Sequence, residues 1–359
     1  MRLAGQHNEG VSIGSLLAFF CLFLSVCAAL GVTSARAETS DTPAATHQKR
    51  AVSFATDWKA QAEQGGFYQA LARGYYAARG LSVTIRSGGP GVNIPQLLGA
   101  GAIEFGMGSN SFIPLNMVRQ GVPAKAVMAA FQKDPQVLIT HPRDDINSLA
   151  DMRGQPIMIA DATIGAFWVW LRATFGFENN QIRKYTYNLA PFLVNPQAIQ
   201  QGYVTSEPYM IKTRGQIEPE VYLLADYGYP GYAAMVLARD ELIENEPDVV
   251  KAFVAASIEG WFDYLYGDPS YGDALIRADN SDITPDILEQ ARLEMRQRGL
   301  VLSGDAETLG IGAMTTERWR QFFTLMADNG VYDPDLDWRA AFSLDFLAGT
   351  PAPRLPSRP

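Results

Sequence analysis

The segment that decides the fold runs from Phe54 to Pro90 and reads FATDWKAQAEQGGFYQALARGYYAARGLSVTIRSGGP. At its start, the apolar run Val52–Thr56 predicts a short strand. From Phe67 to Arg79 apolar residues recur at helical spacing, and Gly80 is the stop signal that ends the predicted helix. Ser82–Arg86 then alternates as a second strand. The segment therefore predicts a strand–helix–strand unit, the building block of a parallel α/β sheet.

A large aromatic residue, Trp58, follows the first predicted strand directly after Asp57. In open α/β sheets, ligands bind in the crevice beyond the carboxyl ends of the strands, where loops carry side chains without disturbing the core. The pair Gly65-Gly66 then permits close approach of the backbone to a ligand or to a neighbouring element. A generic unit in which Trp58 is a core residue is the alternative interpretation.

Strand-like and helical runs continue to alternate along the chain, which is typical of a mostly parallel sheet. Further strands are predicted at Ile103–Gly108, Lys125–Phe131 and Gln136–His141. At Pro142–Asp151 the sequence changes to a polar connector, and Leu149–Gly154 opens a second lobe, in which Pro156–Ala160 is a predicted strand.

The chain is then expected to return to the first lobe. The predicted strand Val221–Asp226 is followed by Tyr227–Tyr232, a run of tyrosine, glycine and proline that suits a hinge, and helices dominate from Glu241 onward. We therefore expect a discontinuous lobe 1 formed by residues 51–142 and 227–347, and a lobe 2 formed by residues 143–226.

The N-terminus predicts export. The almost wholly apolar run Ser15–Val32 precedes Ala35-Arg36-Ala37, a small-x-small cleavage site, so residues 1–37 read as a cleavable signal peptide. A retained membrane anchor is the alternative, because the run approaches the length that spans a bilayer. A lipid anchor through Cys27 is disfavoured, since Val26 is bulky where a small residue is expected.

The flanking composition completes this prediction. Residues 38–50 form a polar tether and residues 348–359 a tail, both expected to be disordered. Cys21 and Cys27 are the two cysteines of the chain, and both lie in the predicted signal peptide, so the exported protein would have no thiol and no disulfide. A periplasmic location follows from this interpretation.

Composition and motifs exclude several classes of function. The chain has 359 residues and a formal net charge of −9, which argues against a nucleic-acid partner. His47 and His141 are far apart in the sequence and suggest no metal site. No sequence motif of a hydrolase, a metalloprotease or a phosphate-binding loop is convincing, so we predict neither catalysis nor a cofactor.

Taken in order, a series of short motifs resembles the thiamine-pyrimidine-precursor-binding family of periplasmic solute-binding proteins, from about Ala51 to Asp345. This family also includes eukaryotic pyrimidine synthases and borders on sulfonate, taurine and nitrate binders. The motifs are Asp57-Trp58, Glu63-Gln64-Gly65-Gly66-Phe67-Tyr68, Gly80-Leu81-Ser82-Val83, Gly88-Gly89, Glu104-Phe105-Gly106-Met107, Leu149-Ala150-Asp151-Met152-Arg153-Gly154, Gly202-Tyr203 and Glu207-Pro208.

The resemblance implies a two-lobed α/β periplasmic binding protein, type II-like, with a hinge and a ligand cleft between the lobes. Such a protein closes on a small-molecule solute and delivers it to the membrane permease of an ABC importer, usually as a monomer. The family's tryptophan corresponds to Trp58, which would stack on a heteroaromatic ring, and its acidic position corresponds to Glu207, which would accept hydrogen bonds from amino groups. Where many members carry a histidine, this chain has Gln64, which cannot titrate and disfavours a pyrimidine synthase-like enzyme.

Other residues near these motifs are predicted to bind the ligand, each with a structural alternative. Tyr68, Tyr227 and Tyr229 could equally be half-buried surface residues. Ser109, Asn110 and Thr163 could be helix caps, and Asn188 could form hydrogen bonds within the protein. The predicted ligand-binding residues beside Trp58 and Glu207 are Glu63, Gln64, Tyr68, Gly88, Gly89, Ser109, Asn110, Thr163, Asn188, Tyr227 and Tyr229.

A small anion such as a sulfonate, taurine or nitrate is the alternative solute. An anion would need a cation in the cleft, and Arg86, Lys133 and Arg143 are the candidates that the sequence offers.

Overall fold

The computed structural model describes residues 48–347. The predicted signal peptide, most of the tether and the predicted tail lie outside these residues. Within residues 48–347, no helix combines the length and apolar character needed to cross a membrane.

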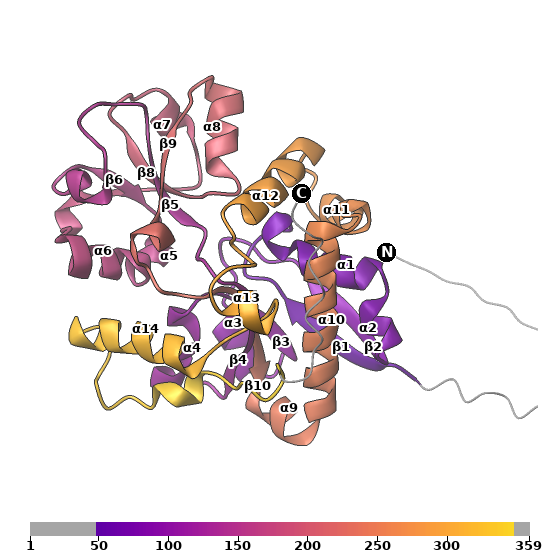
Figure 1. Cartoon of the computed structure of the whole chain (residues 1–359). Helices are drawn as coiled ribbons and strands as arrows, with labels where there is room; N and C mark the ends of the chain where they lie inside the picture. The colour runs from indigo at the N-terminus through magenta and orange to yellow at the C-terminus, as the bar shows by residue number, and fades with distance from the viewer. Residues whose placement is uncertain (1–47, 348–359) are drawn as a thin grey trace, which may run out of the picture. The chain divides into compact units, whose positions relative to one another are not determined.

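The described chain forms two sheets of five strands each (Figure 1). In the first sheet β1 lies between two parallel neighbours, whereas β10 is inserted antiparallel between β3 and β4. The strand order is β2 (Leu81–Arg86), β1 (Arg50–Ala55), β3 (Phe105–Asn110), β10 (Ala233–Arg239) and β4 (Ala124–Phe131).

The second sheet has the same design. β6 is parallel to both of its neighbours, and β5 is inserted antiparallel between β8 and β9. The strand order is β7 (Ile182–Lys184), β6 (Ile157–Ile159), β8 (Ile199–Tyr203), β5 (Gln136–Thr140) and β9 (Glu220–Leu223). In each sheet the reversed strand is therefore the first strand formed after the chain crosses from the other lobe.

One boundary differs from the expectation. The sequence predicts that the run Gln136–His141 belongs to lobe 1, but its strand β5 pairs with β8 and β9 of the second sheet, for example Val137 with Gly202. The chain therefore crosses after β4, before residue 136 rather than after residue 142. A continuous apolar run predicts a buried strand, but it carries no information about which sheet the strand joins.

The predicted helix of the opening unit is present but interrupted. It consists of α1 (Gly65–Ala72) and α2 (Tyr75–Ala78), because Gly74 adopts a left-handed conformation with φ of 72° between them. α1 packs against the long helix α10 (Pro247–Tyr266), as Figure 1 shows.

Glycines set the distance between these two helices. A side chain on Gly66 would come within 2.2 Å of Trp261, and one on Gly260 within 2.2 Å of the carbonyl oxygen of Gly66. The pair Gly65-Gly66 therefore serves the approach of a neighbouring helix, which was one of its two predicted roles. Trp261 is fully buried there against Phe67.

The other helices cover the faces of the two sheets, and apolar side chains beneath them form the cores of both lobes. Apart from α10, the longer helices are amphipathic or end at a glycine. In lobe 1 they are η1 (Ala62–Gln64), α3 (Ile94–Gly99), α4 (Phe112–Gln120), α9 (Asp240–Asn245), α11 (Ser270–Asp279), α12 (Pro285–Gln297), α13 (Asp305–Leu309), α14 (Thr316–Asp328) and η5 (Trp338–Ala341). Lobe 2 and its connections hold η2 (Leu149–Met152), α5 (Asp161–Ile164), α6 (Phe167–Phe175), η3 (Asn179–Gln181), α7 (Ala190–Leu193), α8 (Glu207–Gly215) and η4 (Leu224–Tyr227).

The contact between α1 and α10 gives a direct test of the fold. We expect Gly260→Ala to destabilise the protein by about 1–3 kcal/mol, because the new methyl group meets backbone that cannot move independently of α1. Gly91→Ala is the matched control, since nothing lies within 4 Å of the position of its new methyl group. Urea unfolding of both variants measures the effect, and equal stability of the two would contradict this account of the helix contact.

Candidate functional site

Two aromatic side chains from different lobes contact each other beyond the ends of the strands. Trp58 follows β1 in lobe 1, and Tyr187 follows β7 in lobe 2. Their ring centroids are 4.7 Å apart with an interplanar angle of 50°, and the ring of Tyr185 lies 5.4 Å from that of Tyr187. Trp58 is only partly buried and Tyr187 is 44% exposed, so neither is a core residue.

The backbone at Tyr187 is unusual. Its φ is 60°, a left-handed conformation that residues other than glycine rarely adopt. The loop between β7 and α7 thus presents this ring at an energetic cost, and strained residues of this kind cluster at functional sites.

A carboxylate lies directly beside Trp58. Asp57 accepts a short hydrogen bond at Oδ2 from the hydroxyl of Ser109, at the end of β3. Its other oxygen, Oδ1, is buried and has no hydrogen-bond partner among residues 48–347. Burial raises the pKa of Asp57, and the hydrogen bond from Ser109 opposes part of that effect.

A second carboxylate bridges the lobes. Glu63 in η1 is 3% exposed and accepts a short hydrogen bond from the hydroxyl of Thr205, which lies between β8 and α8 of lobe 2. Burial, together with the charges of Glu207 and Asp57, raises the pKa of Glu63 to about 7, although the hydrogen bond from Thr205 opposes part of that effect. The Glu63 carboxyl therefore titrates near neutral pH at the junction of the lobes.

The third carboxylate, Glu207, is the first residue of α8. Its Oε2 accepts a hydrogen bond of 2.8 Å from the amide of Tyr203, and its Oε1 accepts a long one of 3.4 Å from the hydroxyl of Tyr185. Gly202 leaves room for it, since a side chain there would come within 2.9 Å of the Cβ of Glu207. Glu207, which follows the Gly202-Tyr203 motif, thus has one carboxylate oxygen held firmly by the backbone and the other bonded only weakly.

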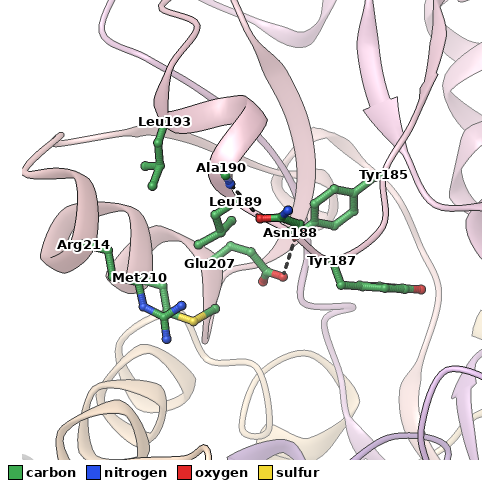
Figure 2. A pocket seen from close by; sticks show the side chains of 9 residues that line it. All are labelled: Tyr185, Tyr187, Asn188, Leu189, Ala190, Leu193, Glu207, Met210 and Arg214. Carbon is green, nitrogen blue, oxygen red and sulfur yellow. Dashed lines mark hydrogen bonds between the residues drawn. The ribbon is translucent and has the colours of Figure 1, made fainter.

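Glu207 also lines a cavity of about 380 Å³ in lobe 2, shown in Figure 2. Tyr187 lies on one side of this cavity, and Met210 and Arg214 lie on the opposite side. The lining is formed by Tyr185, Tyr187, Asn188, Leu189, Ala190, Leu193, Glu207, Met210 and Arg214.

Several other predicted residues support this region. The side-chain oxygens of Asn110 and Asn188 accept hydrogen bonds from the backbone amides of Phe112 (3.1 Å) and Ala190 (3.0 Å), the first residues of α4 and α7, although neither asparagine is the N-cap residue of its helix. Thr163 donates to the side chain of Gln201 at 2.7 Å.

Gly88 and Gln64, two further predicted ligand-binding residues, make contacts within the protein, whereas Gly89 does not. Gly88 donates its amide proton to the Trp58 carbonyl at 3.1 Å, and a side chain there would lie 2.2 Å from the carbonyl oxygen of Thr56, so it holds the Trp58 loop in place. A side chain on Gly89 would meet nothing within 4 Å. Gln64 accepts from the Gln61 amide at 3.1 Å and contacts the Met107 sulfur at 3.8 Å.

The three predicted tyrosines are not brought to the aromatic pair by any recorded contact. Tyr68 is 1% exposed and donates to Asp279 at 2.7 Å. Tyr229 is 2% exposed and packs on Trp170, while Tyr227 is partly buried with its ring 6.4 Å from that of Tyr222. Their part in ligand binding remains a prediction.

Sequence reasoning missed Tyr185, Tyr187 and Thr205. Of the segment YTYNLAPF, which begins at Tyr185, only Asn188 is among the ligand-binding residues that the sequence predicts. The strained backbone and the partner Trp58 become visible only when the two lobes are placed side by side.

The cations considered for an anionic solute have other partners. Lys133 pairs with Asp226 at 2.9 Å, and Arg143 pairs with Asp145 at 2.5 Å. Arg86 is exposed and donates to the Ala102 carbonyl at 3.1 Å. Within residues 48–347, no group of three or more His, Cys, Asp or Glu side chains is arranged to hold a metal ion.

The raised pKa of Glu63 predicts a pH-dependent stability. An ordinary glutamate has a pKa of 4.5, so the folded protein holds this proton more tightly than the unfolded chain, and stability falls as pH rises from about 4.5 to about 7. Glu63→Gln removes this loss. We expect the variant to gain on the order of 2 kcal/mol relative to wild type between pH 5 and pH 8.

Thermal unfolding across that pH range measures the effect, with the exposed Glu244→Gln as control. A difference in Tm between Glu63→Gln and wild type that stays constant with pH would show that Glu63 does not titrate in this way.

Comparison with known proteins places the chain in a family. The riboflavin-binding protein RibY of Chloroflexus aurantiacus is 23% identical over 337 residues, covering 91% of this chain and 95% of that protein. The 4-amino-5-hydroxymethyl-2-methylpyrimidine phosphate synthase of Schizosaccharomyces pombe is 24% identical over 239 residues, covering 60% of this chain and 65% of that protein.

A solved structure with the same fold is the periplasmic aliphatic sulphonate binding protein SsuA from Escherichia coli, with a TM-score of 0.62, 14% identity and coverage of 81% of this chain and 91% of that one. The two-lobed α/β fold predicted from the sequence is thereby confirmed as that of periplasmic binding proteins. The NMT1/THI5 like family pattern matches residues 61–271, more than half of the chain, and the protein belongs to this family.

Proposed function

We propose that the protein is an extracytoplasmic solute-binding protein of an ABC importer, and that it captures a small heteroaromatic solute by closure of its two lobes. The observation that carries this proposal is the contact between Trp58 and Tyr187, one ring from each lobe. Aromatic rings presented at the ends of strands, outside the core, suit a planar ligand.

The distance between these rings bears on how a solute enters. A ring placed between two others needs about 7 Å between the outer planes, because each carbon contact takes about 3.5 Å. The centroids of Trp58 and Tyr187 are 4.7 Å apart, so the solute would enter with the rings separated and the lobes would then close on it. The two crossovers, before β5 and between β9 and β10, are where such a hinge motion would occur.

The polar groups beside the rings suit the edge of a nitrogen heterocycle. Asp57 and Glu63 each accept one hydrogen bond from another side chain, and the bond that Glu207 accepts at Oε1 is long. Ser109 at the end of β3 and Asn188 in the loop after β7 add polar groups to this region. Pyrimidine-like compounds, thiamine precursors and riboflavin, named in the relative RibY, all present N–H groups or ring nitrogens at such an edge.

A small anion is the less favoured solute. The likeness to sulphonate-binding proteins concerns the fold, and the three candidate cations are engaged elsewhere or exposed. A sulfonate or nitrate would instead face carboxylates, which would repel it.

An enzymatic role is also less favoured. One relative is a pyrimidine phosphate synthase, but this chain has Gln64 where the resemblance leads us to expect a histidine, and its amide is occupied by Gln61 and Met107. Export to the periplasm, capture of the solute without turnover and delivery to a permease remain parts of the proposal, supported by the N-terminal sequence and the fold.

Removing either ring tests the proposal. A thermal-shift screen of residues 38–359 with heteroaromatic compounds and anions first identifies a solute that stabilises the protein. We then expect Trp58→Ala and Tyr187→Ala each to raise its Kd by about 5- to 30-fold, because each loses a stacking contact and buried apolar area worth about 1–2 kcal/mol.

Tyr271→Ala is the control, since Tyr271 is 46% exposed on α11 in lobe 1 and contacts Arg73. Isothermal titration calorimetry gives the Kd values. If both ring variants bind within twofold of wild type, or if only anions stabilise the protein, the proposal of a stacked heteroaromatic solute is wrong.

A further inference from the structure

We infer that the solute held between Trp58 and Tyr187 carries a positive charge, as an alkylated or protonated nitrogen heterocycle does. This inference rests on the proposed function and deepens it by giving the charge of the solute. Four separate observations support it: the carboxylates near the aromatic pair, a buried carboxylate oxygen without a partner, the lack of an ion pair to these carboxylates among residues 48–347, and the character of the rings.

The first observation is that the residues around the aromatic pair include carboxylates from both lobes. Asp57 precedes Trp58 in lobe 1, and Glu63 accepts a hydrogen bond from Thr205 of lobe 2. Glu207 of lobe 2 accepts a hydrogen bond from Tyr185, whose ring lies next to that of Tyr187. Like charges that are brought together away from water repel one another, so closure of the lobes around a neutral solute carries an electrostatic cost.

The second observation is that one of these carboxylates has a buried oxygen without a hydrogen-bond donor. Oδ1 of Asp57 is buried and has no partner among the described residues, and Glu63 is 3% exposed. A buried acceptor without a donor is costly, and a cation or its attached N–H group beside Trp58 would remove that cost.

The third observation is that the nearby lysine and arginine side chains form no ion pair with these carboxylates. Lys59, next to Trp58 in the sequence, points to Asp282 at 3.5 Å, and Lys184 of β7 pairs with Asp161 at 3.1 Å. Arg214 lines the cavity on the side away from Tyr187, two turns along α8 from Glu207 (Figure 2). None of these residues pairs with Asp57, Glu63 or Glu207 in the described part of the chain.

The rings themselves favour the same kind of solute. The faces of Trp and Tyr rings are electron-rich and attract cations, and sets of such rings with acidic neighbours recognise quaternary ammonium groups. Trp58, Tyr187 and Tyr185 follow one another at centroid distances of 4.7 and 5.4 Å. A cationic ring would gain both stacking and charge attraction here, whereas a neutral ring would gain stacking alone.

Matched pairs of compounds that differ in a fixed charge test the inference. The probes are nicotinamide with 1-methylnicotinamide and quinoline with 1-methylquinolinium, titrated into the full exported chain by calorimetry at low salt. We expect the cation of each pair to bind at least about tenfold tighter than its neutral partner, and this ratio to shrink as salt is added.

The same ratio in charge-removing variants assigns the effect to the site. Asp57→Asn and Glu207→Gln should each reduce the ratio by about threefold or more, while the affinity for the neutral compound changes less. Glu244→Gln, which removes an exposed charge at the end of α9, should leave the ratio unchanged. Because Asp57→Asn risks disturbing the loop, thermal unfolding is checked first, and Glu207→Gln provides an independent result.

Each outcome bears on a distinct statement. Equal binding of the cation and the neutral compound overturns the positive charge of the solute but leaves ring capture in place. A cation preference that neither variant reduces shows that these carboxylates are not its source, which also overturns the inference. Failure of every ring compound to bind contradicts the proposed function itself, and the inference falls with it.

Discussion

The structure is constrained above all by the carboxylates that lie where the two lobes meet, of which Glu63 is buried and Asp57 and Glu207 are partly buried. Glu63 and Asp57 come from one lobe and Glu207 from the other, and burial raises the pKa of Glu63 to about 7. Ionised carboxylates cannot be buried together without donors or a compensating charge. The short hydrogen bonds from Ser109 and Thr205 supply part of that compensation. The remaining cost falls on Oδ1 of Asp57, which is buried and has no hydrogen-bond partner among residues 48–347.

Glycines in the surrounding fold keep these groups in place, because the missing side chains leave room for close contacts. Gly202 leaves room for Glu207, and Gly88 lets its backbone reach the residues that precede and carry Trp58. Farther from the cleft, Gly66 and Gly260 bring α1 and α10 into contact, which fixes η1 and thereby Glu63. A glycine motif that looks like a ligand loop in the sequence can thus act through packing.

Much of the fold followed from the sequence because the strand–helix–strand unit after Ala51, the second lobe and the returning chain all have local signals. The assignment of β5 to a sheet did not, since an apolar run such as Gln136–Thr140 contains no information about its neighbours. The same limit applies to the site. Trp58 and Glu207 stand beside recognisable motifs, whereas Tyr187 and Thr205 matter because of partners more than 100 residues away. Hydrogen bonds to the first amide of a helix and bonds to a ligand also use the same residue types, as Asn110 and Asn188 illustrate.

The reversed strands have a consequence for how the polypeptide acquires its structure. β10 separates β3 from β4, yet it lies beyond the whole of the second sheet in the chain. The first sheet cannot close until residues 233–239 have been synthesised, and until then the facing edges of β3 and β4 lack their backbone partners. Pairings of such long sequence separation form slowly. A nascent chain of this design stays incompletely folded for most of its synthesis, and the unpaired edges of β3 and β4 need protection from aggregation until β10 is available.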